Sequence, residues 1–246
     1  MGSYREELQR VRASYTAEKA AEERDGERLA YWCYRPLSFY VTPLFLRLGW
    51  TADGVCGLQL VLALALPAVA WPGGWPGAAA VVTLALAIQV LDCVDGNLAR
   101  TTRRFSPVGQ LLEGFCTQIF WTFYFLAAGV VGRGEGSWAA EHSVVIGLAM
   151  ALLFVGQRSL EDNFDQACAE RVRWTPPAVQ ASRFAWWPKV IEHTAAFGGL
   201  LALAAWGRPA WFMIGLAAYQ GTVFLLWLPR FVRAVVVRSR RGRGSE

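Results

Sequence analysis

The chain has 246 residues, of which 54% are hydrophobic and only 17% are charged, and its net charge is +5. No charged residue occurs from Gly54 to Leu91, and Glu113 is the only one from Phe105 to Gly132. A transmembrane helix needs ~20 consecutive apolar residues, and these runs are longer. This composition excludes a soluble enzyme, a secreted disulfide scaffold and a disordered chain. In a membrane protein the basic residues gather on the cytoplasmic side and indicate topology. The net charge of +5 therefore does not point to nucleic acid, and we expect no nucleic-acid partner.

The N-terminal part of the chain is polar. Residues 4–30 are dense in Arg and Glu, which predicts one amphipathic cytoplasmic helix, either solvated or lying on a lipid surface. The stretch Pro36–Trp50 mixes aromatic residues with one arginine, a pattern typical of a helix at the membrane interface. We therefore expect three parts: a charged N-terminal helix over 1–34, a membrane domain over 35–235 and a basic cytoplasmic tail over 236–246.

The apolar part of the chain is divided by clusters of Pro, Gly and charged residues. These breaks predict six transmembrane helices, at 51–71, 74–98, 107–131, 138–160, 190–207 and 209–229. With the N-terminus inside, all but two of the 24 basic residues are cytoplasmic, as the positive-inside rule requires; the exceptions are Arg133 and Arg208. The predicted fold is an all-α integral protein of the cell membrane, with six transmembrane helices, an N-terminal interfacial amphipathic helix and both termini cytoplasmic.

Three carboxylates fall inside the predicted spans, namely Asp92, Asp95 and Glu113. A charged group at the centre of a membrane helix costs ~2.5–3.5 kcal/mol, so such groups are candidates for function. Asp92 and Asp95 share one helical face, because they are three residues apart. Glu113 lies on the next span in a stripe that repeats every four residues, and a short turn brings the two faces together. The stripe also contains Gly109 and Thr117.

These residue types together suit a phosphate site that holds divalent metal. Oxygen ligands without His or Cys favour Mg²⁺, Mn²⁺ or Ca²⁺ over zinc. Gly96, Ala99 and Gly109 leave space for a ligand, and Arg100 adds a positive charge at the cytoplasmic mouth. The alternative is a polar packing contact in which protonated carboxyl groups bond to each other between the two spans.

The segment from Asp92 to Thr117, DCVDGNLARTTRRFSPVGQLLEGFCT, resembles the signature of the CDP-alcohol phosphotransferases, D-x2-D-G-x2-A-R-x8-G-x3-D-x3-D. Every spacing is kept. The preceding RPLSFYVTPLFLRLGWTADGV looks like the interfacial helix and first span of that family. The resemblance covers roughly residues 35–235. Six positions match it residue for residue: Asp92, Asp95, Gly96, Ala99, Arg100 and Gly109.

The resemblance implies a reaction in which a hydroxyl attacks the phosphorus on the alcohol side of a CDP-alcohol. CMP leaves, and a phosphodiester with a lipid or polar alcohol acceptor is formed. It also implies a homodimer in the lipid membrane, with the active site toward the cytoplasm. The residues implied are metal ligands for Mg²⁺ or Mn²⁺ at Asp92, Asp95 and Glu113, and nucleotide contacts at Gly96, Ala99, Arg100 and Gly109.

The chain departs from the signature at its third and fourth acidic positions, which are Glu113 and Thr117. Glu keeps the charge, whereas Thr neither balances a second metal ion nor accepts a proton at neutral pH, although the family uses its fourth acid as the general base. Three explanations are open: another base or an already ionised acceptor, a specialised donor, or a non-catalytic binding protein or transporter. His193 is the substitute base we expect, since its ordinary pKa is ~6.5. The alternative for His193 is a structural role at the start of a helix.

The second substrate has candidates near the cytoplasmic ends of the fourth and fifth spans. Arg158 begins a charged cluster, and Lys189 begins another. We expect these two basic residues to bind the acceptor. The alternative is a solvated cytoplasmic rim. The other charged or ionisable members of the clusters are Glu161, Asp162, Asp165, Glu192 and His193.

Overall fold

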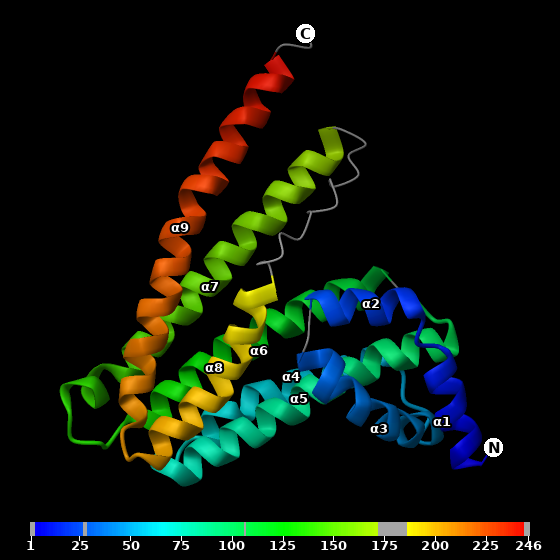
Figure 1. The fold of residues 1–246 in the computed structure, drawn as a ribbon, viewed down its shortest axis with the longest axis horizontal. Helices are drawn as coiled ribbons and strands as arrows, with labels where there is room; N and C mark the ends of the chain where they lie inside the picture. Colours follow the sequence, from blue (N-terminus) through cyan, green and yellow to red (C-terminus); the bar gives the residue numbers. More distant parts are fainter. Residues whose placement is uncertain (1–2, 27–28, 106, 172–185, 244–246) are drawn as a thin grey trace.

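The computed structural model describes residues 3–26, 29–105, 107–171 and 186–243, and in these ranges the chain is built from helices and turns without a strand (Figure 1). Nine α-helices and one π-helical turn, Ala30–Tyr34, follow one another in these ranges. The α-helices are α1 Tyr4–Ala13, α2 Ala17–Gly26, α3 Arg35–Arg47, α4 Ala52–Val69, α5 Gly74–Thr102, α6 Pro107–Gly132, α7 Trp138–Arg171, α8 Trp186–Ala205 and α9 Pro209–Arg243.

Within the described ranges, five helical segments are long and apolar enough to cross a membrane, which confirms an all-helical protein with several candidate spans. The sixth predicted span, 190–207, falls in α8, where Ala196–Ala205 is the apolar stretch among residues with described side chains. That span stays a prediction. The five segments are Ala52–Val69, Gly74–Thr102, Leu111–Gly132, Trp138–Leu160 and Pro209–Arg233.

The N-terminal segment is two helices, so the single helix expected over 4–30 was wrong. Ser3 caps α1 by a capping box with Glu6, and α1 ends at Ala13. The C-cap residue is Ser14, whose hydroxyl donates to the Val11 carbonyl (2.8 Å). The Thr16 hydroxyl then accepts from the Lys19 amide (3.2 Å) at the start of α2. Serine and threonine compete for backbone hydrogen bonds, and here they divide a stretch whose charge pattern alone looks continuous.

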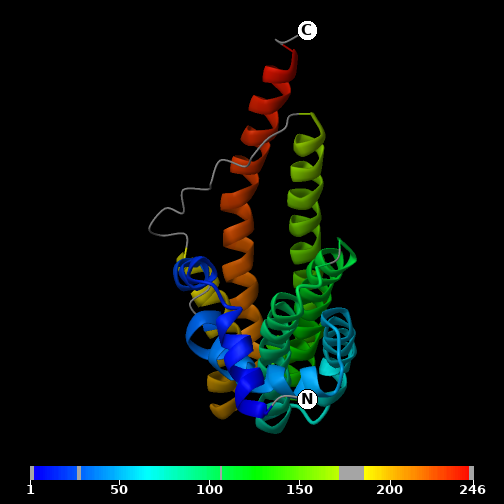
Figure 2. The same cartoon turned by 90° about the vertical axis from the view of Figure 1, so that its right-hand side faces the viewer.

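The centre of the bundle is an aromatic cluster around α6. Trp121, Tyr124 and Phe125 of α6 are buried; Trp121 and Tyr124 contact Phe197 of α8, and Trp121 and Phe125 contact Phe154 of α7. The Tyr124 hydroxyl donates to a carbonyl of α8 (2.6 Å), so this buried polar group is satisfied. Helices α7 and α9 run side by side and extend beyond the other helices (Figures 1 and 2).

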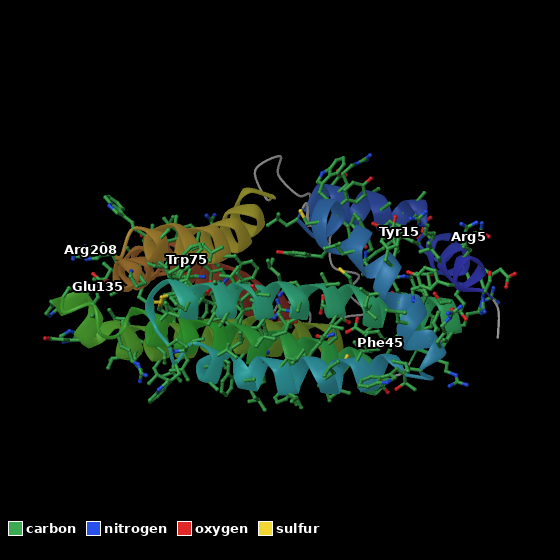
Figure 3. The ribbon with its side chains drawn as sticks, turned by 90° about the horizontal axis from the view of Figure 1, so that it is seen from below. Arg5, Tyr15, Phe45, Trp75, Glu135 and Arg208 are labelled. Atoms are coloured by element: carbon green, nitrogen blue, oxygen red, sulfur yellow. The ribbon has the colours of Figure 1, made fainter. Side chains whose placement is uncertain are left out.

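One end of the bundle carries exposed tryptophans near the turns between helices. Trp75 lies at this end together with Glu135 and Arg208, whereas Arg5 and Tyr15 lie at the opposite end (Figure 3). The Glu135 carboxylate pairs with Arg208 (3.5 Å) and accepts from the amide of Ala210 (2.9 Å). Tryptophans in such a position are typical of a membrane interface. Those exposed near these turns are Trp71, Trp75, Trp138, Trp206 and Trp211.

Candidate functional site

A cavity of about 330 Å³ lies between α4, α5 and α6, where the turn after α5 leads into α6. Five residues of the sequence signature line it, and they come from both helices that the signature spans. The lining residues are Ala52, Asp53 and Cys56 of α4, Asp95, Gly96 and Ala99 of α5, Arg104 and Phe105 of the turn, and Gly109 and Glu113 of α6.

Asp95 is the buried carboxylate of the cavity, with only 7% of its surface exposed. Its Oδ2 accepts from Gln59 Nε2 (2.8 Å) and from Cys56 Sγ (3.3 Å), both of α4. Buried carboxylates need such donors, because desolvation of the charge is otherwise expensive. The Thr51 hydroxyl caps α4 through the amide of Gly54 (3.1 Å), and this start of the helix places Cys56 and Gln59 one turn apart on the face toward Asp95.

The other predicted metal-ligand and base positions are less buried than Asp95, and only some of them line the cavity. Glu113 is exposed and lines the cavity. Asp92 is half-buried, and Thr117 is exposed with its hydroxyl donating to the Glu113 carbonyl (3.1 Å). Neither Asp92 nor Thr117 belongs to the cavity lining. In the described ranges, no three His, Cys, Asp or Glu side chains are close enough to form a metal-binding group as they stand. Two of the three expected metal ligands, Asp95 and Glu113, therefore share the cavity.

Arg100 folds back along α5 instead of extending to the mouth of the cavity. Its Nη2 donates to Asn97 Oδ1 (2.9 Å), and a Cβ placed on Gly96 would lie 3.3 Å from Arg100 Nη1. The glycine thus leaves room for the guanidinium beside the cavity. Arg100 Nε is buried and has no hydrogen-bond partner within the described part of the chain. A buried donor of this kind costs free energy unless a ligand satisfies it, which makes it a candidate contact for an anion.

Sequence reasoning missed several residues of the site. Asp53 and Arg104 line the cavity, and Gln59 holds Asp95, although none of the three belongs to the signature. One signal was present, because Gln59 is a polar side chain in an otherwise uncharged run and a polar group inside a membrane span needs a partner. Cys56, the second donor to Asp95, is a buried free cysteine.

Of the two expected acceptor residues, the structure describes the side chain of Arg158 alone. Arg158 is exposed on α7 and does not line the cavity. Lys189 and His193 belong to α8, but their side chains lie outside the described residues, and so do those of the acidic residues that follow Arg158. The assignments of Arg158, Lys189 and His193 therefore stay predictions.

Comparison of the chain with protein-family models and with curated proteins finds no match.

Proposed function

We propose that the protein is a membrane phosphotransferase that moves a phospho-alcohol group from a CDP-alcohol to an acceptor and releases CMP. The observation that carries the proposal is the cavity itself, which gathers Asp95, Gly96, Ala99, Gly109 and Glu113 from two helices. These residues come from two different helices and line the same cavity. This arrangement supports a role in binding one ligand together. Small residues leave room for that ligand, and the carboxylates and arginines give the polar groups that a metal-bound diphosphate needs.

The donor set of the cavity suits a hard divalent cation. Asp95, Glu113 and Asp53 offer carboxylate oxygens around one space, and Mg²⁺ or Mn²⁺ prefers such ligands. Asp95 and Glu113 would hold the ion, with Asp92 one helical turn before Asp95. A bound ion would supply charge stabilisation at the phosphoryl oxygens. Gln59 and Cys56 keep the Asp95 carboxylate in a fixed position.

The arginines of the site would offset the negative charge of the donor. Arg104 lines the cavity, and the buried Nε of Arg100 lies on a side chain packed along Gly96. Bonds from guanidinium to phosphate are about twice as strong as neutral hydrogen bonds. Arginine contacts of this kind orient the diphosphate so that the phosphorus on the alcohol side faces the acceptor.

The transfer step requires a bond from the acceptor oxygen to that phosphorus, while the bond between phosphorus and the CMP oxygen breaks. CMP leaves with the bonding electron pair, and the proton of the acceptor hydroxyl goes to a base. Glu113 is an exposed carboxylate of the cavity from within the signature, and it takes the proton in this proposal. Thr117 does not serve as the base, because its hydroxyl is neutral and is already bonded to its own helix.

A second candidate function, binding or transport of a nucleotide-linked ligand without catalysis, is favoured by one observation. The position at which the family has its fourth acid is Thr117, and it stands outside the cavity lining. A site without that acid would still bind a diphosphate through Asp95, Arg100 and a divalent ion.

The finer arrangement in the membrane is part of the same proposal. Six spans, with α8 as the fifth, would place the cavity and both termini in the cytoplasm and the end that carries Trp75 outside. The basic residues of α9 after Pro229 would then also be cytoplasmic. We further propose a homodimer, as the resemblance implies.

The test is release of CMP by the purified protein in lipid nanodiscs with Mg²⁺ or Mn²⁺ and a panel of CDP-alcohols. We expect release with at least one donor, and loss of release in Asp95→Asn. Glu141→Gln is the matched control, because Glu141 is an exposed carboxylate outside the cavity. CDP binding without turnover for any donor would support the second candidate. Equal CMP release by Asp95→Asn and the parent would contradict the assignment of the activity to this cavity.

A further inference from the structure

We propose that the N-terminal segment positions Arg100 for the anion of the ligand, through a buried chain of contacts from Glu23 to Arg35 to Asn97. Glu23 and Arg35 are positioning residues in this inference, since neither lines the cavity. Arg100 does not line it either, but its guanidinium packs against Gly96, which does. The inference rests on the proposed function only in taking the anion to be the diphosphate of a nucleotide. It gives the first thirty residues a role at the site, which their charge pattern did not predict.

The chain of contacts begins at a buried ion pair between α2 and α3. Glu23 and Arg35 are 1% and 6% exposed, and Arg35 donates through Nε (3.0 Å) and Nη2 to the two carboxylate oxygens. The Tyr15 hydroxyl donates to the same carboxylate (2.8 Å). Burial raises the pKa of Glu23, but the hydrogen bonds and the charge of Arg35 outweigh it and hold the pKa below its usual value. Glu23 is therefore ionised at neutral pH and compensates the charge of Arg35.

The remaining donor of Arg35 reaches α5 within the signature segment. Arg35 Nη1 donates to the Cys93 carbonyl (2.8 Å) and to Asn97 Oδ1 (3.0 Å). Asn97 is fully buried, and its Nδ2 donates to the hydroxyls of Ser38 (3.0 Å) and Thr42 (3.1 Å) of α3. Both hydroxyls already donate to backbone carbonyls of α3, so they act as acceptors here. This pattern fixes the orientation of the Asn97 amide, with its oxygen toward the two arginines.

Arg100 is the last member of the chain of contacts. Its Nη2 donates to the same Asn97 oxygen (2.9 Å), and no carboxylate of the described residues forms an ion pair with it. Two guanidinium groups therefore share one amide oxygen, and like charges this close repel each other unless one is compensated. Glu23 compensates Arg35. Arg100 keeps its charge for a ligand anion; its two terminal nitrogens lie beside Gly96, and its buried Nε has no partner among the described residues.

The docking of the N-terminal helices does not depend on this chain of contacts alone. Glu7 pairs with Arg47 (2.8 Å), and the Tyr4 hydroxyl donates to the Tyr40 carbonyl (2.8 Å). Ser14 of the same segment bonds to Thr101 at the end of α5. The Glu7 pair thus also joins the N-terminal segment to α3, but it has no link to Asn97. Glu7→Gln is therefore the matched control for Glu23→Gln.

The experiment measures binding of CDP, cytidine and inorganic pyrophosphate to the purified full chain in nanodiscs with Mg²⁺. Glu23→Gln removes the charge with little change in size, and we expect it to weaken pyrophosphate and CDP binding about tenfold, as loss of one charge-assisted contact does. Cytidine binding should not change, and Glu23→Asp should recover most of the affinity. Glu7→Gln should bind all three probes as the parent does.

The outcomes separate a positioning role from a structural one. Equal pyrophosphate affinity of Glu23→Gln and the parent would overturn the inference, and so would an equal loss of cytidine and CDP binding. If Glu23→Gln does not fold, Tyr15→Phe removes one hydrogen bond to the same carboxylate, and it should weaken pyrophosphate binding about twofold while cytidine binding is unchanged. Unchanged pyrophosphate binding in that variant would likewise overturn the inference.

The proposed function fails separately from this inference. If the parent binds pyrophosphate in a manner that depends on Glu23 but releases no CMP from any donor, the positioning role stands and the transferase does not. If the parent releases CMP and Glu23→Gln behaves as the parent does, the transferase stands and the positioning role does not. A parent that binds neither CDP nor pyrophosphate contradicts both.

Discussion

The contact between α6 and α7 depends on glycine, and it gives a prediction with an internal control. Gly147 of α7 is buried, and a Cβ placed on it would lie 2.5 Å from the Phe125 carbonyl oxygen of α6. Backbone atoms cannot move aside as a flexible side chain does, so the helices must separate. Gly156 of the same helix is exposed, and its Cβ would meet no described atom within 4 Å. The two glycines therefore differ in packing but share their helix.

Substitution of each glycine by alanine should change the free energy of unfolding in opposite directions. Gly147→Ala should lose about 1–3 kcal/mol from overpacking, offset by at most ~1 kcal/mol of helix propensity. Gly156→Ala should gain about 0.4–1 kcal/mol. Unfolding of both variants in mixed micelles with increasing SDS would compare their midpoints with that of the parent. Equal midpoints for the two variants, or a gain for Gly147→Ala, would refute the close approach of α6 and α7.

Three further predictions concern topology, the base position and pH. In a cysteine-free background, Arg133→Cys should react with an impermeant reagent in intact cells while Arg103→Cys should not, and labelling at 103 would contradict the proposed topology. Thr117→Asp should raise CMP release if the site is a weakened form of the ordinary enzyme. A fall would show that the site is adapted to threonine, because the added carboxylate repels that of Glu113 one helical turn away when no metal ion lies between them. The pKa of Glu23 is held below its usual value in the folded protein, so the stability that its ionised form contributes is complete above the pKa of Glu23 in the unfolded chain. This stability is lost as the pH falls through the lower pKa of the folded protein. Limited proteolysis of the N-terminal segment should therefore become faster in that pH range, and an unchanged cleavage rate would contradict the pair with Arg35.

The positions of the spans and the two stripes of the candidate site were predictable from the sequence. Uncharged runs and Pro or Gly breaks are local features, and they gave helix starts within a few residues of α4 to α7 and α9. The spacing of Asp95, Gly96 and Ala99, and of Gly109 and Glu113, also determined which residues face one side of each helix. The structure places these five residues around one cavity, as that spacing predicts.

The sequence did not show which groups from elsewhere in the chain reach the site. Gln59 holds Asp95 across a separation of 36 residues, and Glu23 meets Arg35 only after the chain has turned between α2 and α3. No periodicity encodes such contacts, because they depend on how helices cross and on which buried polar groups must find partners. The place of Arg100 in the sequence predicted a positive charge at the cavity mouth. In the tertiary structure its guanidinium bonds to Asn97 instead, because buried polar groups need partners. Local pattern thus determined the helices and their polar faces, and the need to satisfy buried charge in three dimensions decided how the site is held.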